Sequence, residues 1–290
     1  MKLTCSIDEI SRLGPEDVKE ILDKDKSAEY QLLDVRQPYE YEAGHIPGAK
    51  WIPLGELEYR HAELERDKKI ITYCRSGHRS MAASISLCGL GFENVYNLDG
   101  GILNWHYDVI KGIPEERPEL ITGKEDVGDI LMLALKLEKG AIDFYSKAQE
   151  KVRDKKAVQM FQKLAGWEEK HMERIYLQYS QLMGEDKLPP LERLKAELSS
   201  IYMEGGIKIN EELIKIGELK FIDDFEALEI ALEKEYMSYD FYKRVAGLVG
   251  DSKARSMLHE LAGEERNHIN ALLQQIEEPK GGGQQRSLKE

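Results

Sequence analysis

Residues 164–171 read LAGWEEKH and residues 261–268 read LAGEERNH, so one Glu-x-x-His pair occurs twice in this chain, 97 residues apart. The same offset relates a second acidic position, because Glu138 becomes Glu235 when 97 is added to its number. Each copy therefore contributes two carboxylates and one imidazole. The six candidate metal ligands are Glu138, Glu168, His171, Glu235, Glu265 and His268.

The surroundings of the two copies repeat as well, which separates them from a chance match. A Glu and a His three residues apart also occur at Glu42 and His45, and such a lone pair carries no information. By contrast, residues 143–145 and 240–242 both read Asp-Phe-Tyr at the same offset of 97. The repeat therefore predicts two copies of one helical hairpin.

The spacing of apolar residues is helical from residue 125 onward, with few glycines inside the periodic segments. Helices are predicted at 125–151, 155–183, 223–248 and 252–276, and a crossover with short helices of its own at 191–222. Within each hairpin the ligand positions are symmetric about a polar turn, at residue 153 or residue 250. Residues 15 positions from such a turn stand about 22 Å from it, so all six side chains can meet in one layer.

The set of side chains suits a pair of divalent metal ions. Four carboxylates and two imidazoles supply hard oxygen and borderline nitrogen donors, and this arrangement is typical of di-iron and di-manganese helical bundles. Without metal, four inward carboxylates would repel one another in a core of low dielectric constant. The alternative is solvated glutamates on amphipathic helices, which the second copy disfavours. The donor types fit iron and manganese alike.

Residues 125–277 resemble the rubrerythrin branch of the ferritin-like superfamily. The resemblance rests on four stretches: LALKLEKGAIDFY (133–145), LAGWEEKHMERI (164–175), ALEKEYMSYDFY (231–242) and LAGEERNHINALL (261–273). It implies an all-α four-helix bundle that holds two iron ions through the six residues named above. It also points to a homodimer formed through the bundle.

Two departures from that family limit what the resemblance implies. Rubrerythrins carry a rubredoxin iron site made of two CxxC pairs, which this sequence lacks, and an extra Glu at the position of Ser238. An external electron donor protein is therefore expected. The leading hypothesis is a redox enzyme that reduces peroxide or dioxygen, and the alternative is a non-catalytic module that binds, stores or senses iron.

The region 1–112 alternates short β-like runs with helical stretches, which predicts an α/β layer with a parallel sheet and flanking helices. Strands are expected at 31–35, 70–73 and 95–98, and helices at 16–24 and 80–91. Residues 113–124 hold two prolines, a glycine and dense charge, and are interpreted as a linker. The bundle then occupies 125–278, and the Gly-rich residues 279–290 are expected to be disordered.

Cys74 ends the second expected strand and precedes a tight loop and a helix that opens near Ser80. Backbone N–H groups and the positive end of the helix dipole would converge on its sulfur and favour the thiolate. This makes Cys74 a candidate nucleophile and persulfide carrier. Cys88, by contrast, fits the interpretation of a buried, inert cysteine.

The N-terminal region resembles a single-domain rhodanese through the stretches 32–49, 73–80 and 97–105. The resemblance implies that Cys74 takes a sulfane sulfur from thiosulfate or a persulfide and passes it to a thiol or cyanide. The loop that cradles the anion would comprise Arg75, Ser76, Gly77, His78 and Arg79, while Asp34, Arg36 and His45 look structural. Only four residues separate Cys74 from Arg79, whereas phosphatases and arsenate reductases typically have five.

The composition excludes several other classes of partner. The chain has 290 residues and a formal net charge of −13, which argues against nucleic acid or an anionic membrane. The three cysteines, Cys5, Cys74 and Cys88, provide no disulfide framework, so a reducing cytoplasm is expected. No organic cofactor is expected.

Overall fold

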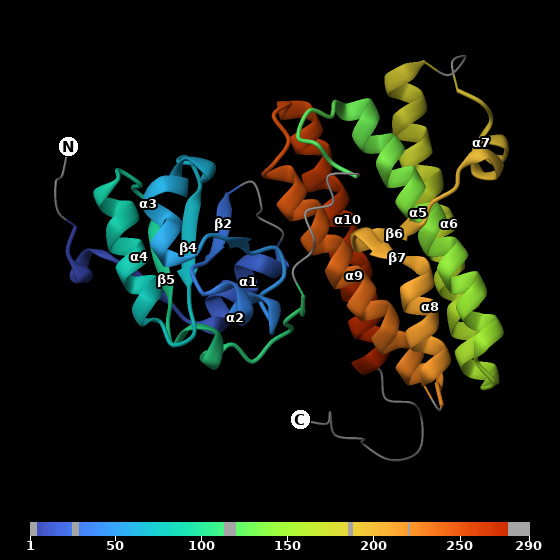
Figure 1. The fold of residues 1–290 in the computed structure, drawn as a ribbon, viewed down its shortest axis with the longest axis horizontal. Helices are drawn as coiled ribbons and strands as arrows, with labels where there is room; N and C mark the ends of the chain where they lie inside the picture. Colours follow the sequence, from blue (N-terminus) through green and yellow to red (C-terminus); the bar gives the residue numbers. More distant parts are fainter. Residues whose placement is uncertain (1–4, 25–28, 113–119, 185–187, 220, 278–290) are drawn as a thin grey trace.

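The computed structural model describes residues 5–24, 29–112, 120–184, 188–219 and 221–277. An α/β layer is followed by a bundle of long helices, and the two lie side by side (Figure 1). The expected disordered tail at 279–290 and most of the expected linker lie outside the described residues. Among the described residues, no helix is both long enough and apolar enough to cross a membrane.

The α/β layer is built on one parallel sheet with the strand order β1-β5-β4-β2-β3. Its strands are β1 (Ser11–Leu13), β2 (Tyr30–Asp34), β3 (Lys50–Trp51), β4 (Lys69–Tyr73) and β5 (Val95–Leu98). Its helices are α1 (Pro15–Asp23), α2 (Pro38–Glu42), α3 (Leu57–Arg60) and α4 (His78–Gly89). The three predicted strands and the parallel sheet are confirmed, while β1 and β3 are too short to leave a periodic signal.

Helix α4 begins at His78, two residues before the predicted start at Ser80. The cause is Gly77, which precedes the helix with a φ of +89°, a left-handed conformation that favours glycine. This glycine turns the chain sharply enough for the helix to start at once. His78 and Arg79 therefore belong to the first turn of the helix rather than to the loop.

The bundle contains four long helices in two antiparallel hairpins, as the repeat predicts. They are α5 (Val127–Lys151), α6 (Lys155–Met183), α9 (Asp224–Ala246) and α10 (Ser252–Glu277). Aspartate side chains accept hydrogen bonds from backbone N–H groups at the starts of all four, through Asp126, Asp154, Asp223 and Asp251. These caps fix where the helices start and so the height of the ligand positions.

The crossover between the hairpins contains more than the short helices that were expected. Its elements are α7 (Leu191–Glu197), β6 (Tyr202–Met203), a 3-10 turn (Glu204–Gly206), β7 (Ile207–Lys208) and α8 (Ile209–Glu218). Strands β6 and β7 pair antiparallel. The small β-hairpin contacts α5 through β6 and α9 through its turn (Figure 1).

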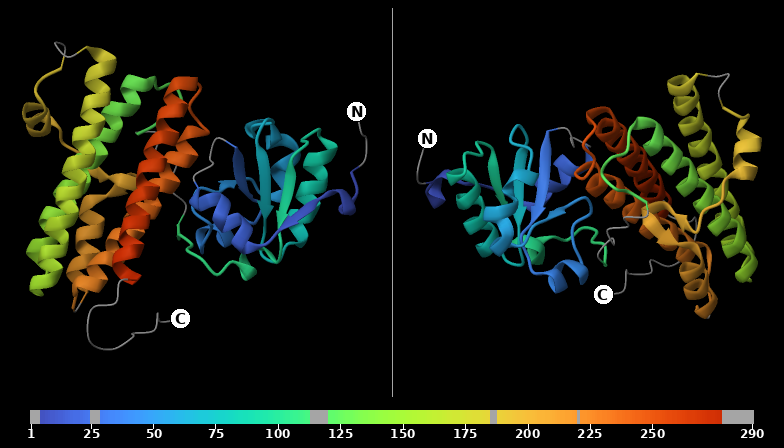
Figure 2. Two further views of the ribbon diagram at one scale, coloured as in Figure 1. Left: turned by 180° about the vertical axis from the view of Figure 1, so that it is seen from behind. Right: turned by 45° about the horizontal axis from the view of Figure 1, so that its top comes forward.

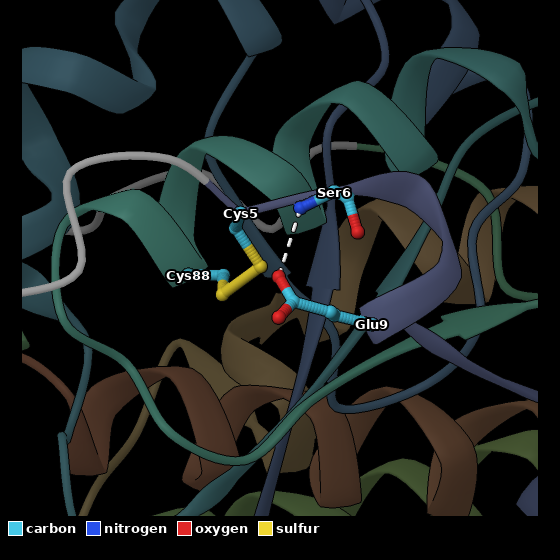
Figure 3. Close-up of a disulfide and its surroundings, with 4 residues drawn as sticks. All are labelled: Cys5, Ser6, Glu9 and Cys88. Atoms are coloured by element: carbon cyan, nitrogen blue, oxygen red, sulfur yellow. Dashed lines mark hydrogen bonds between the residues drawn. A yellow bond between two sulfur atoms is a disulfide. The ribbon is translucent and has the colours of Figure 1, made fainter.

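A disulfide joins Cys5 to Cys88, with 5.9 Å between their Cα atoms (Figure 3). This corrects two expectations, that the chain has no disulfide and that Cys88 is an inert free thiol. The N-terminal segment lies against α4, which brings together two cysteines that are 83 positions apart in sequence. Cys74 is the free cysteine. The cysteine count therefore no longer supports a reducing compartment.

The two domains contact each other through α9 and α10, which lie nearest the α/β layer in every view (Figures 1 and 2). The hydroxyl of Tyr236 donates a hydrogen bond to Asp108, and Arg266 forms an ion pair with Asp23. Ile110, which follows the α/β layer, packs into the apolar core of the bundle. The two domains therefore share polar and apolar contacts.

Candidate metal centre and persulfide loop

The six predicted metal ligands come together inside the bundle, one or two from each long helix. Five of them are fully buried, and the side chain of His268 is 14% exposed. In sets of three, their donor atoms lie within 4.8 Å of one another. The structure thus brings together all six residues that the repeat indicated.

The two copies of the hairpin place their ligands in matching ways. In one half, His171 Nδ1 lies 2.9 Å from Glu138 Oε1; in the other, His268 Nδ1 lies 3.3 Å from Glu235 Oε2. These two pairs are related by the offset of 97. The two imidazole rings meet edge to face, with 4.9 Å between their centroids. The internal repeat of the sequence is therefore also a repeat of geometry.

Most carboxylate oxygens of the predicted ligands have no hydrogen-bond partner among the described residues. Among the described residues, both oxygens of Glu138, Glu168 and Glu265 are buried without a hydrogen-bond partner. Buried polar atoms are normally satisfied, and buried charges are paired or coordinate metal ions. These orphaned oxygens, together with two imidazoles, fit a pair of cations.

The pKa shifts of the residues in this cluster also favour the binding of cations. Burial and repulsion between neighbouring carboxylates raise the pKa of Glu138, Glu168 and Glu235 well above the ordinary value. Burial lowers the pKa of His171, but the carboxylates around it, Glu264 first, outweigh burial and raise it to about 9. In the absence of other cations, protons on these groups offset the negative charge. Metal binding would therefore compete with protons.

Glu204 is a further carboxylate in this cluster that the sequence reasoning missed. It lies in the turn of the crossover hairpin, is 1% exposed, and has an Oε1 without a hydrogen-bond partner. That oxygen lies 4.0 Å from His171 Nδ1. Burial, followed by repulsion from Glu265, raises the pKa of Glu204 to about 7. The sequence does mark this position, because Glu204 is a lone acidic residue in the stretch MEGGI (203–207). It follows an apolar residue, and two glycines and a second apolar residue come after it.

Glu264 is a second acidic residue that the reasoning passed over. Its carboxylate forms an ion pair with His171 Nε2 on the outer side of the cluster and lies 3.8 Å from Arg174. Burial raises the pKa of Glu264, but the contact with His171 outweighs this effect and lowers it. Because it engages the second nitrogen of the imidazole, Glu264 can fix the orientation of the ring.

In the α/β layer, Cys74 is buried at the end of β4, where the backbone turns toward α4. Its Sγ accepts hydrogen bonds from the backbone N–H of Gly77 at 3.1 Å and from the hydroxyl of Ser80 at 3.4 Å. Burial opposes ionisation, but these donors together outweigh it and lower the pKa of Cys74. Ser80, which was expected only as the start of the helix, therefore stabilises the thiolate.

The side chains of the predicted anion cradle are placed unequally around Cys74. Arg75, Ser76 and His78 are exposed, and the Ser76 hydroxyl lies 3.1 Å from His78 Nδ1. Arg79 donates two hydrogen bonds to Glu40, at 2.6 and 2.7 Å. Glu40 was not among the predicted site residues, and it fixes the position of this guanidinium.

The loop is supported from behind by the Gly-Gly turn that follows β5. The backbone N–H of Ile102 donates to the carbonyl of Cys74 at 2.8 Å. A Cβ atom on Gly101 would lie 2.4 Å from that same carbonyl oxygen, so only glycine allows this approach. The backbone around the cysteine is thereby held in one conformation, with its N–H groups directed at the sulfur.

The expected structural residues of this domain are indeed internal. Arg36 donates to both carboxylate oxygens of Asp34 and to the carbonyl of Gly44, and Asp34 and Arg36 are buried. His45 is stacked on Tyr41, with 3.7 Å between the ring centroids. These contacts shape the layer without reaching the sulfur of the loop.

Comparison with family models divides the chain in the same way. Residues 14–108 match the model of the rhodanese-like domain, and residues 129–276 match that of rubrerythrin. Both matches fall on the regions whose sequence motifs carried the resemblance.

Three similar proteins extend the comparison for the first region. An uncharacterised protein, YqhL of Bacillus subtilis, is 45% identical over 75 residues, which are 26% of this chain and 60% of that protein. The thiosulfate sulfurtransferase GlpE of Pseudoalteromonas translucida is 38% identical over 86 residues, covering 30% of this chain and 79% of GlpE. A rhodanese-related structure from Thermoplasma volcanium is 36% identical, with a TM-score of 0.32. The match covers 34% of this chain and 97% of that one. The chain spans 51% and 60% of the length of two of its curated relatives.

Proposed function

Because this chain belongs to the rubrerythrin family and also carries a rhodanese-like domain, we propose that it joins two activities in one polypeptide. The α/β layer is a sulfurtransferase that works through a persulfide on Cys74. The bundle is a di-iron carboxylate domain that reduces peroxide or dioxygen. The observation that carries the first part is the thiolate-stabilising hydrogen bond from Gly77 to Cys74 Sγ.

The sulfur transfer takes place in two displacements. The thiolate of Cys74 attacks the outer sulfur of thiosulfate, the S–S bond of the donor breaks, and sulfite leaves with the bonding electron pair. A thiolate or cyanide then attacks the terminal sulfur of the persulfide, and Cys74 leaves again as a thiolate. The N–H of Gly77 and the hydroxyl of Ser80 stabilise that leaving group, because both donate to Sγ.

The second part is supported by the donor set inside the bundle. Two iron ions, when bound, supply one-electron redox chemistry. Glu138 and Glu235 would hold them from the first helix of each hairpin, and the Glu-x-x-His pairs from the second. His171 and His268 lie against carboxylates of the same cluster and can hold or release a proton there. No CxxC pair exists in the sequence, so electrons would come from a separate donor protein.

The sulfurtransferase is tested by a thiosulfate:cyanide assay on Cys74→Ser. The variant should lose the activity and keep the metal content of the wild-type protein. Cys88→Ser, which removes a sulfur near the other end of α4, should keep the activity. Retained activity in Cys74→Ser would sink the assignment.

The bundle is tested by anaerobic loading with Fe(II), followed by elemental analysis and then addition of hydrogen peroxide. About two irons per chain are expected, with oxidation faster than that of the same iron in buffer. Uptake of many irons per chain would instead favour storage. Oxidation no faster than in buffer would exclude the redox role.

A further inference from the structure

The crossover hairpin packs against the bundle through unusually close backbone contacts. A Cβ atom on Gly140 of α5 would lie 2.1 Å from the carbonyl oxygen of Tyr202 in β6. On the other side, Gly205 has a φ of +69°, and a Cβ atom there would lie 2.9 Å from Cβ of Met237 on α9. Both contacts require glycine, because any side chain would force the backbones apart.

These contacts lie close to the ligand positions along the helix axes. Gly140 follows Glu138 by two residues and Met237 follows Glu235 by two residues, which is about 3 Å of rise on each helix. The hairpin is therefore held at the height of the metal cluster. Glu204 stands immediately before Gly205, at the point where this backbone turns.

The carboxylate of Glu204 lies among donors from all four long helices. One set of mutually close donor atoms joins it to Glu138, His171 and Glu265, and another joins it to Glu168 and Glu235. Its Oε1 is buried and, among the described residues, accepts no hydrogen bond. A buried glutamate held in this way by its own backbone, with one carboxylate oxygen lacking a hydrogen-bond partner, has the features of a metal ligand.

The position that would carry an extra carboxylate on α9 holds Ser238 instead. Ser238 is fully buried, and among the described residues its Oγ has no hydrogen-bond partner. Its side chain is shorter than that of glutamate and bears no carboxylate, so a carboxylate ligand must come from another element. Glu204 is the additional buried carboxylate that the described structure places in the cluster.

We propose that Glu204 is the seventh metal ligand of this bundle, supplied by the crossover in place of a carboxylate at position 238. This inference rests on the proposed metal centre. It has a structural consequence, because a ligand in the crossover ties that segment to the metal. Metal binding then holds the hairpin against α5 and α9.

The first experiment measures metal affinity and the number of ions bound, by titration of metal-free protein with Fe(II) or Co(II) under anaerobic conditions. Glu204→Ala should weaken binding of at least one ion by about tenfold or more. The double variant Glu204→Ala/Ser238→Glu should recover much of the affinity, since it returns a carboxylate from α9. The matched control Glu211→Gln, an exposed glutamate of the same crossover, should bind as the wild type does.

The second experiment follows amide hydrogen exchange of the crossover with and without metal. In the wild-type protein, metal should slow exchange in residues 198–208, and in Glu204→Ala it should not. Equal affinity and equal protection in Glu204→Ala and wild type would overturn the inference while leaving the metal centre intact. A wild-type protein that binds no metal would instead overturn the proposed function itself.

Discussion

Asp240 of the bundle accepts a hydrogen bond at 2.8 Å from the backbone N–H of Gly48 in the α/β layer. The carboxylate is fully buried, accepts a second hydrogen bond from Arg244 at 3.0 Å, and lies 3.7 Å from His45 Nε2. Burial would raise the pKa of Asp240, but Arg244, His45 and the Gly48 N–H outweigh it and lower the pKa. The domains are therefore joined by a buried, ionised carboxylate.

The repeat supplies a matched control for this contact, because Asp143 occupies the equivalent position on α5. Its side chain is 34% exposed and pairs with Lys139 at 2.5 Å on the surface of the bundle. Asp240→Asn should lower the free energy of unfolding by roughly 2–3 kcal/mol, since it leaves Arg244 without its anion. Asp143→Asn should change it by less than about 0.5 kcal/mol. Urea unfolding of both variants provides the comparison, and equal effects would contradict a structural role for the contact.

The lowered pKa of Asp240 also determines how the difference in unfolding free energy between wild type and Asp240→Asn depends on pH. A carboxyl group whose pKa is depressed by folding contributes stability above its unfolded pKa of about 3.9, and loses it as the pH falls through the folded value. The stability difference between wild type and Asp240→Asn should therefore be full at pH 7 and shrink below about pH 4. Urea unfolding across this pH range measures it. A difference that stays constant down to pH 2 would show that the charge is not responsible.

Ser80 should control the reactivity of Cys74. Ser80→Ala removes one donor to the thiolate, so the pKa of Cys74 should rise and its alkylation by iodoacetamide at pH 7 should slow by roughly 3- to 10-fold. The rate should recover at alkaline pH, where the thiol ionises without help. Ser86→Ala, an exposed position on the same helix, should leave the pH profile unchanged. A loss of rate at every pH would indicate damage to the loop instead.

The disulfide predicts a response to reductant. It closes a loop of 83 residues, so its loss should lower the free energy of unfolding by roughly 2–5 kcal/mol. Reductant should destabilise the wild-type protein and leave Cys88→Ser unaffected. Thiol titration of the unfolded, unreduced chain should find only the thiol of Cys74. Three titratable thiols would contradict the disulfide.

Metal affinity should depend steeply on pH. His171 and His268 have a pKa raised to about 9, so both are largely protonated at neutral pH in the metal-free protein. A metal ion must displace those protons, and affinity should therefore rise with pH up to about 9. Calorimetry in buffers of different ionisation enthalpy measures the released protons directly. Binding without proton release would contradict this account.

The sequence contains enough to predict the α/β layer, from its alternation of strands and helices, and the six-residue cluster, from the internal repeat. The ligands are symmetric about residues 153 and 250, and turns at 152–154 and 247–251 do separate the helices. Arithmetic on residue numbers is reliable there because a helix has a constant rise per residue. The start of α4 at His78 could not be predicted from a constant rise per residue, because this start depends on the left-handed conformation of Gly77.

Contacts between distant segments could not be predicted in the same way. Glu204 lies in the crossover, which has no second copy to reveal it. Cys5 and Cys88 form a pair that only the path of the N-terminal segment brings about. Asp240 and Asp143 share a motif, and nothing in that motif tells which of them faces the other domain. Each of these relationships depends on how separate elements pack, and periodicity within one element carries no information about it.

The crossover occurs once, whereas the hairpins occur twice, and this difference in copy number breaks the symmetry of the centre. Glu138 with His171 and Glu235 with His268 would offer two ions the same surroundings. Glu204 forms one set with Glu138, His171 and Glu265 and another with Glu168 and Glu235, but no set among the described residues joins it to His268. Two identical ions would therefore become chemically distinguishable, with one filling first and one exchanging more readily. A duplicated architecture would thus hold a centre with two different halves.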